Sequence, residues 1–502
     1  MFQTLKNAWK TPELKNKLLF TLVIVILYRI GANIMVPWID TSIVGDASRF
    51  SGTILDYLNT LSGGALSQAT LFALSVSPYI TASIVMQLLT IAIPKLEELA
   101  KDGEEGKKKI SAITRIVTVV LALITSFGYT MMIMSQNMTT LCELKYNTLG
   151  QFTGVVWKTA SHYGVIGEKF NMVEIFKNGA GLQFVTIIAC YCAGAALVMW
   201  LAEKINEKGI GNGISIILFA NILSGVPGMV SGLWALASTP FKMHKGSFHA
   251  AMIVGPLVAL VVVAAVIAAA WFVIWFTNSE RRIPVQYAKR VVGRKMYGGQ
   301  ASNLPLKLNM SGVMPIIFAN AIVTIPATIA MFTGNVKAEW MQKVNAYIGK
   351  FNQANPVYIV LFAILLVAFA FFYIMISFNP VEVSNNIRNN GGAVPGIRPG
   401  KPTKDYIQKI LNRVTFIGAI FLAVIAVLPM IVYAILSIDA INVATANFFG
   451  VFLVRYYNYA SGVLDSIAFS GSSLLIVTGV AIETVRELEA QLTMRNYKGF
   501  LD

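Results

Sequence analysis

The sequence is poor in the residues on which soluble enzymes, secreted domains and metal proteins depend. Charged residues fill only 13% of its 502 positions, whereas an ordinary soluble domain carries about 25%. Its three cysteines, Cys142, Cys190 and Cys192, are too few for a disulfide framework and lack the spacing of metal ligands. Its three histidines do not form the HExxH motif of zinc enzymes. We therefore expect no cofactor and no metal.

Acidic residues are also scarce, with 24 Asp and Glu against 40 Lys and Arg. No apolar run holds a pair of carboxylates, whereas ion-coupled transporters carry ionisable groups near the middle of the bilayer. Two glycine motifs resemble phosphate-binding turns, but Gly209–Gly213 follows no strand and Gly396–Pro402 has the wrong spacing. The sequence thus disfavours ion-driven transport and predicts that the protein is not an enzyme.

Long apolar runs, in contrast, are abundant. Hydrophobic residues make up 56% of the chain and gather in runs of about 20 residues, the length of a helix that crosses a bilayer. We predict an all-α polytopic membrane protein whose first span is retained, because no small-residue cleavage site follows it. The ten predicted spans lie near residues 18–36, 70–93, 112–135, 182–202, 211–233, 250–277, 311–332, 356–379, 407–436 and 470–486.

Basic residues are distributed unevenly among the segments between these spans. Alternate segments, which include both termini, hold about 25 Lys and Arg, and the other set holds about 11. Because positively charged loops face the cytoplasm, we expect both termini to be cytoplasmic. The sequence EELAKDGEEGKKKI, on the same side, balances acids and bases and predicts a solvated turn.

Two long loops on the basic side differ from simple connections. The loop 278–310 has seven basic residues and one acid, and Tyr297-Gly298-Gly299 with nearby Val and Tyr residues predicts a hairpin-like protrusion. The loop 380–406 is rich in Gly, Pro and Asn and predicts an ordered segment without a long helix. Together they indicate a docking surface; the alternative is that their charge only fixes the topology.

The stretch from Ser62 to Thr90 is unusual for a membrane span. It begins with small and polar residues and continues as an apolar helix that Ser77-Pro78 is expected to interrupt. Backbone of this kind is tolerated at membrane depth only where protein buries it or a watery cavity borders it. Val76 and Ile80 lie four residues apart, as do Ile214 and Leu218, so each pair occupies one helix face. Ordinary core packing explains such spacing equally well.

Several segments, spread from near residue 18 to the C-terminus, carry distinctive motifs. They are SGGALS with SPYITASIVMQLLT, EKGIGNGISIILFANI, RRIPVQYAKR with LPLKLNMSGVMPIIFA, FNP with VPGIRPGKPT, and FSGSSLLIV. In this order they resemble the SecY family, the central subunit of the bacterial protein-conducting channel. The resemblance implies ten transmembrane helices around a central hourglass-shaped pore. It also implies two pseudo-symmetric halves, residues 1–250 with spans one to five and residues 251–502 with spans six to ten.

The resemblance also implies four groups of functional residues. The pore ring comprises Val76, Ile80, Ile214, Leu218, Ile317 and Ile476. The plug covers about residues 52–68 and includes Ser62, Gly63, Gly64, Ala65, Leu66 and Ser67. The lateral gate between the second and seventh spans holds Thr81, Ser83 and Gln87 facing Asn309, Ser311 and Asn320, which are expected to hydrogen-bond across the seam. The partner-binding residues are Lys289, Arg290 and Arg398.

The implied function is a gated channel in the bacterial plasma membrane. It passes unfolded preproteins outward and releases apolar segments laterally into membrane lipid. A SecA motor ATPase or a ribosome, whose RNA phosphates attract basic loops, drives the passage of preproteins that carry signal sequences. Small SecE- and SecG-type membrane subunits brace the bundle. The alternatives from other classes are a secondary transporter for a small solute and a membrane-embedded enzyme.

Overall fold

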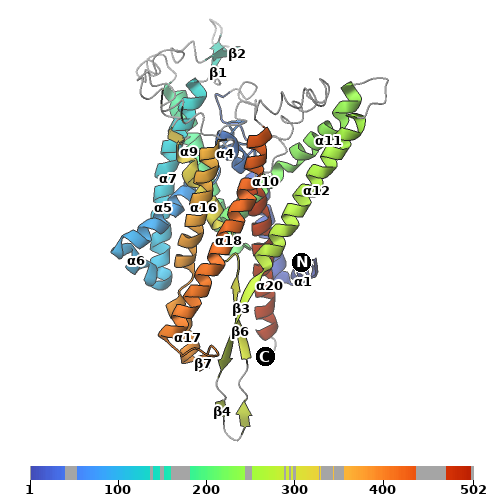
Figure 1. The fold of residues 1–502 in the computed structure, drawn as a ribbon. Coiled ribbons are helices and arrows are strands. Elements are labelled where there is room, and N and C mark those ends of the chain that lie inside the picture. The colour runs from blue at the N-terminus through green and yellow to red at the C-terminus, as the bar shows by residue number, and fades with distance from the viewer. Residues whose placement is uncertain are drawn as a thin grey trace.

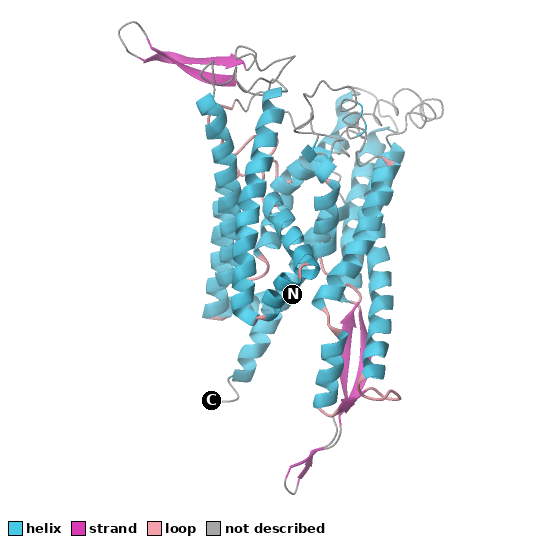
Figure 2. Cartoon of the chain, turned by 90° about the vertical axis from the view of Figure 1, so that its left-hand side faces the viewer, coloured by secondary structure: helices cyan, strands magenta, loops and turns pink. Residues whose placement is uncertain are grey.

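A computed structural model gives the fold, an elongated bundle of helices with a β-hairpin at one end (Figures 1 and 2). The structure describes residues 2–39, 54–135, 140–146, 152–159, 181–243, 251–287, 290–292, 295–297, 301–326, 328–329, 343, 347, 355–436 and 471–498. The long outer segment 437–469 and Lys289 lie outside this set.

A helix lies at each of the ten predicted spans. The helices are α1 (Phe2–Lys10), α2 (Pro12–Gly31), α4 (Ile54–Ser62), α5 (Ser77–Ala92), α6 (Pro94–Lys101), α7 (Gly103–Ser135), α9 (Gly181–Lys208), α10 (Gly213–Ser224), α11 (Val226–Met243), α12 (Ala251–Asn278), α13 (Met314–Val323), α16 (Pro356–Ser377), α17 (Pro380–Asn389), α18 (Lys401–Leu436) and α20 (Gly471–Lys498). Within the described residues, 6 segments are long and apolar enough to cross a membrane by themselves, and the number is 7 if the bent pair α5–α6 is counted as one span. The protein is therefore a multi-pass, mainly helical membrane protein.

The second span differs from its prediction at its beginning. Residues 71–76 form turns, and the helix starts only at Ser77, with Pro78 in its first turn. Proline is favoured there because the first backbone N–H groups of a helix have no intrahelical partner. Ser77-Pro78 thus begins the helix, and the prediction that it interrupts one is wrong.

The other end of this span also corrects a prediction. The helix α5 ends at Ala92, and Pro94 begins α6 at an angle of 102° to it. The segment expected to form a solvated turn consists of the second half of α6 and the first two turns of α7. No residue of α6 is buried, and an ion pair between Lys101 and Glu97, 2.7 Å apart, spans one turn of its surface. Local helix propensity and this i,i+4 pair outweigh the charge balance that suggested a loop.

The hairpin predicted in the first basic loop is confirmed. Its strands β3 (Glu280–Tyr287) and β6 (Ala301–Lys307) pair antiparallel, with Glu280 opposite Lys307. Beyond them, β4 (Arg290–Val292) pairs with β5 (Lys295–Tyr297). Tyr297, which we expected in a turn, is the last residue of β5, and the two glycines after it lie outside the described residues.

The two basic loops form one unit, which the sequence did not predict. The short strand β7 (Gly392–Ala393) of the second loop pairs with the end of β3, so that the order in the sheet is β6-β3-β7. Their common apolar core contains Ile283 and Val285 of the first loop and Ile387 and Val394 of the second. The second loop also begins with the 10-residue helix α17, a short helix that is compatible with the predicted ordered segment without a long one.

The remaining strands, β1 (Thr140–Tyr146) and β2 (Phe152–Thr159), form a second hairpin at the opposite end of the bundle (Figure 2). The two termini lie at the end that carries the β3–β6 hairpin (Figure 1). There the hydroxyl of Thr4 in α1 donates a hydrogen bond of 3.0 Å to Glu489 in α20. The N-terminal and C-terminal helices are thus packed together on one face.

Candidate functional site

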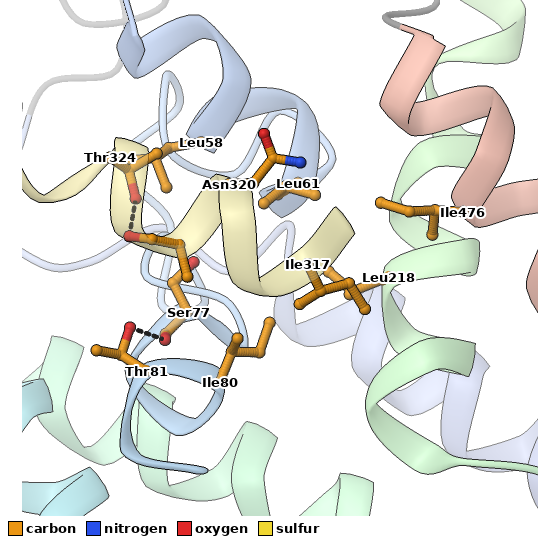
Figure 3. A pocket seen from close by; sticks show the side chains of 11 residues that line it. Leu58, Leu61, Ser77, Ile80, Thr81, Leu218, Ile317, Asn320, Thr324 and Ile476 are labelled. Carbon is orange, nitrogen blue, oxygen red and sulfur yellow. Dashed lines mark hydrogen bonds between the residues drawn. The ribbon is translucent and has the colours of Figure 1, made fainter. Parts of the chain in front are cut away.

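A cavity lies at the centre of the bundle, where α4, α5, α10, α13 and α20 converge (Figure 3). Its lining residues are Leu58, Leu61, Ser77, Ile80, Thr81, Leu218, Ile317, Asn320, Ala321, Thr324 and Ile476. The lining is mostly aliphatic, with four polar side chains on α5 and α13. Residues far apart in the sequence, predicted separately as plug, ring and gate, therefore meet around one space.

Four of the six predicted ring residues, Ile80, Leu218, Ile317 and Ile476, line this cavity. Each has 6% or less of its surface exposed. The other two, Val76 and Ile214, belong to the same apolar cluster but do not line the cavity. These four residues give the cavity a largely aliphatic wall, and their role as a pore ring stays a prediction.

The glycine motif before α10 places Leu218 at the cavity. The side chain of Asn212 caps the helix by accepting hydrogen bonds from the backbone N–H groups of Ile214 and Ser215, at 3.0 and 3.4 Å. A Cβ atom on Gly213 would lie 2.0 Å from the carbonyl oxygen of Ala202 in α9. Only glycine allows this approach, so the motif serves helix capping and packing.

The predicted plug is a short helix followed by a tight turn, and Leu58 and Leu61 of α4 project into the cavity (Figure 3). Its first residues, 52–53, lie outside the described set. Gly63 and Gly64 have φ angles of 67° and 87°, in the left-handed region that favours glycine. Ser62, Ala65, Leu66 and Ser67 are buried. The paired glycines thus have a conformational role that the sequence analysis did not anticipate.

Hydrogen bonds within the plug hold this turn. The hydroxyl of Ser62 accepts a hydrogen bond from the backbone N–H of Leu66 at 3.0 Å. The side-chain oxygen of Asn59 accepts one from the backbone N–H of Ser67 at 2.9 Å. The Ser67 hydroxyl donates to the carbonyl of Gly64, also at 2.9 Å. The plug is therefore an ordered, internally bonded element in this structure.

Comparison with known proteins agrees with this arrangement. The SecY family model matches residues 70–485. The protein translocase subunits SecY of Streptomyces scabiei and Bacillus subtilis are 38% and 37% identical to the chain, over 506 and 503 residues, and each alignment covers 100% of both chains. The chain belongs to the SecY family.

Solved structures share the fold at low sequence identity. A structure described as that of a protein conducting channel has a TM-score of 0.54 and 15% identity, and the match covers 95% of this chain and 92% of that one. The canine Sec61 channel in a ribosome-channel complex from the endoplasmic reticulum gives a TM-score of 0.53, 15% identity and the same coverage. These likenesses place the architecture of this SecY-family chain among those channels.

The six predicted gate residues of this SecY-family chain do not hydrogen-bond to one another across the seam in the described structure. Thr81 donates to the carbonyl of Ser77 in its own helix at 3.0 Å. Gln87 donates to Ser83 at 3.4 Å, again within α5, and the Ser311 hydroxyl donates to the side-chain oxygen of Asn309, two residues away, at 3.3 Å. The sixth, Asn320, is 2% exposed and neither of its amide atoms has a partner among the described residues. The expectation of hydrogen bonds that hold the seam is wrong for this state.

Replacing Asn320 with Leu is expected to stabilise the conformation seen in this structure. A buried polar group without a partner costs about 1–3 kcal/mol, and leucine of similar size removes that cost. We expect a higher midpoint of thermal unfolding and slower export of preproteins whose signal sequences are weakly apolar. Asn309→Leu is the matched control, because it removes an acceptor of the Ser311 hydroxyl and should destabilise. A lower unfolding midpoint in Asn320→Leu contradicts this prediction.

Of the predicted partner-binding residues, Arg398 is placed most clearly. It lies in the turn after β7 with an exposed side chain, and the hydroxyl of Thr403 donates to its carbonyl at 2.8 Å. Arg290 is the first residue of β4, and Lys289 lies outside the described residues. At the base of the same hairpin, partial burial lowers the pKa of the Lys307 ammonium, and nearby Arg486 adds to this effect.

Functional residues that the sequence analysis missed surround the plug. The hydroxyls of Tyr129 in α7 and Tyr191 in α9 donate to the carbonyls of Leu66 and Ala69, the latter at 3.3 Å. Asn221 in α10 also contacts the plug. A single amide in an otherwise apolar helix was a visible signal, but its partner is a backbone carbonyl, which no sequence motif reveals.

Proposed function

We propose that this SecY-family protein is a gated channel through which unfolded preproteins leave the cytoplasm. The convergence of plug, aliphatic ring and gate residues around one cavity carries this proposal. In the resting state Leu58 and Leu61 of the plug fill the outer side of the constriction. During passage the plug moves aside and the aliphatic side chains close around the moving chain without binding any particular sequence.

The lateral gate is the seam between α5 and α13. Residues 1–250 and 251–502 act as two halves that part at this seam, so an apolar signal sequence moves from the pore into membrane lipid. The gate polar residues keep their hydrogen bonds within their own segments. Opening the seam therefore breaks no hydrogen bond between them, which supports a gate that opens at low cost.

The channel lies in the bacterial plasma membrane with both termini in the cytoplasm. The positive charge of the hairpin side supports this orientation, and the curated relatives are bacterial translocase subunits. Movement of the preprotein is driven by a SecA-type ATPase or by a ribosome, and SecE- and SecG-type subunits complete the assembly. The Sec61 neighbour in a complex with a ribosome supports the ribosomal docking. The chain itself performs no catalysis in this scheme.

A crosslink from a stalled preprotein tests this proposal. A preprotein with a photoreactive or thiol-reactive residue in its mature part is stalled during translocation, and one cysteine is placed in a channel without native cysteines. We expect Ile317→Cys in the cavity lining to crosslink strongly. The matched control is Val261→Cys, because Val261 in α12 is 56% exposed. This variant should not crosslink. Equal crosslinking at both positions, or none at Ile317→Cys, overturns the proposed path.

A further inference from the structure

Three side chains that no part of the channel mechanism has used form a buried cluster against the plug. They are Tyr28 in α2, Ser75 just before α5, and Asn221 in α10, and each is 3% exposed or less. The amide nitrogen of Asn221 lies 2.7 Å from the carbonyl oxygen of Leu61, 2.9 Å from the Tyr28 hydroxyl and 3.2 Å from that of Ser75. Three separate segments of the bundle thus meet at one carbonyl of the plug.

Assigning the hydrogens along the shortest contacts satisfies every donor of this cluster. The two amide hydrogens of Asn221 take their two shortest contacts, the Leu61 carbonyl and the Tyr28 hydroxyl. Tyr28 then donates to Ser75 across 3.3 Å, and Ser75 donates to the Leu61 carbonyl across 3.4 Å. In this arrangement the hydrogen bonds run in a chain from Asn221 through Tyr28 and Ser75 and end at the Leu61 carbonyl of the plug.

The acceptor at the end of this path needs an external partner. Leu61 lies in the last turn of α4, which ends at Ser62, and the last four carbonyls of a helix have no intrahelical donor. A buried carbonyl without a partner is costly. The cluster therefore satisfies a group that α4 cannot satisfy by itself, and it does so only while the plug is in place.

Ser75 also connects the cluster to the ring. Its φ of 49° lies in the left-handed region, which is unfavourable for any residue with a Cβ atom. It directly precedes Val76, the N-cap of α5. Contacts from its hydroxyl to Tyr28 and Asn221 hold this strained backbone. Displacement of the plug removes the Leu61 carbonyl from the same hydroxyl, so plug and ring are linked through Ser75.

The side-chain oxygen of Asn221 has no hydrogen-bond partner among the described residues. An unpaired buried oxygen destabilises the packed state, so packing alone does not account for an amide at this position. The two N–H donors of the amide nitrogen do explain why an asparagine is present here, because an apolar residue of the same size supplies no hydrogen-bond donor.

We propose that Asn221, supported by Tyr28 and Ser75, is a positioning residue that latches the resting plug. It sets how often the plug leaves its seat before a preprotein arrives. This inference rests on the proposed function of residues 52–68 as the plug. It adds a specific donor for a specific carbonyl, and it predicts that the stability of the seal is adjusted from α10.

The test measures plug displacement directly. Ala65, 1% exposed in the plug, is replaced by Cys in a channel without native cysteines. Its labelling by a membrane-impermeant maleimide is followed in proteoliposomes of the complete translocase. Loss of a hydrogen-bonded contact of this kind changes an equilibrium about tenfold, so Asn221→Leu should accelerate labelling of the resting channel about tenfold. Tyr28→Phe, which removes only the hydroxyl, should accelerate it by a smaller factor.

Two controls separate a latch from general loosening. Ser215→Ala changes a buried hydroxyl of α10 that has no partner among the described residues, and it should leave the rate unchanged. With a preprotein stalled in the channel the plug is already displaced, and the Asn221→Leu channel should label at the parent rate. Faster labelling in that state as well indicates a loosened fold and overturns the latch.

The remaining outcomes are equally decisive. An unchanged resting rate in both Asn221→Leu and Tyr28→Phe, with preprotein export intact, overturns the latch while leaving the plug proposal in place. Rapid labelling of Ala65→Cys in the otherwise unaltered resting channel overturns the plug assignment itself. If Asn221→Leu does not assemble, the conservative Tyr28→Phe variant decides by the same rate.

Discussion

Replacing Arg398 with Glu is expected to reduce SecA-driven translocation at least about tenfold while leaving the channel folded, since an arginine anchor of an interface contributes about 2 kcal/mol or more. Gly396 and Gly400, on either side of Arg398, adopt φ angles of 79° and 96°, and the Thr403 hydroxyl donates to the Arg398 carbonyl. The side chain itself makes no ion pair among the described residues and points to solvent. A charge reversal there changes the docking surface without disturbing the core.

The matched control for this variant is Arg388→Glu. Arg388 is an exposed arginine at the end of α17 in the same loop, so both variants change the net charge of the loop equally. Translocation of a preprotein into inverted membrane vesicles, measured by protease protection, compares the two. Equal loss in both variants means that only the charge of the loop matters, and normal translocation in Arg398→Glu removes this residue from the docking site.

Shortening two ring residues together, Ile80→Ala and Ile317→Ala, is expected to raise the resting ion conductance of the channel at least about tenfold, because the aliphatic constriction excludes water only while it is narrow. Both side chains line the central cavity and lie on the two helices of the gate. Single-channel recordings in planar bilayers measure the leak. Alanine is preferable to glycine, since it leaves the helix propensity of α5 and α13 intact.

The control for the ring variant shortens two isoleucines on the lipid-facing surface. Ile91 on α5 and Ile325, two residues beyond α13, are 53% and 44% exposed, and Ile91→Ala with Ile325→Ala removes the same atoms outside the cavity. This control should conduct no more than the parent channel. If the ring variant conducts no more ions than this control, Ile80 and Ile317 are ordinary core residues and not part of a seal.

Sequence reasoning located helices and the hairpin well because their signals are local. Apolar runs of spanning length and a basic segment with β-branched residues were sufficient for them. It failed for β7, since a strand of 2 residues has no periodicity and its pairing with β3 joins segments about a hundred residues apart. It also failed at the gate, where polar residues on two facing helices suggested bonds between them. In the structure, Thr81 and Gln87 each donate a hydrogen bond to another residue of α5 instead.

In the candidate site, too, the sequence located some residues and missed those whose position depends on the complete fold. The resemblance chose six ring residues, and the structure brings four of them to the cavity lining. Val76 caps α5 directly before Ser77, which does line the cavity, and Ile214 lies one turn before Leu218 in α10. Both side chains pack in the apolar cluster instead of lining the cavity. The residues that hold the plug escaped prediction for another reason. Their partners are backbone carbonyls, and the position of a carbonyl depends on the complete fold.

Side chains of the bundle hydrogen-bond to backbone carbonyl oxygens of the plug, which every amino acid possesses. Asn221 and Tyr129 donate to the backbone of Leu61 and Leu66 in the plug, and Tyr191 donates to that of Ala69, one residue beyond it. The acceptor in each of these three bonds is a backbone carbonyl and not a side chain. Selection on these bonds therefore falls on the helices that donate, while the plug can change in sequence as long as it keeps its turn and its buried apolar side chains. Plugs exchanged between distant relatives should consequently seat in one another's channels more readily than their sequences suggest.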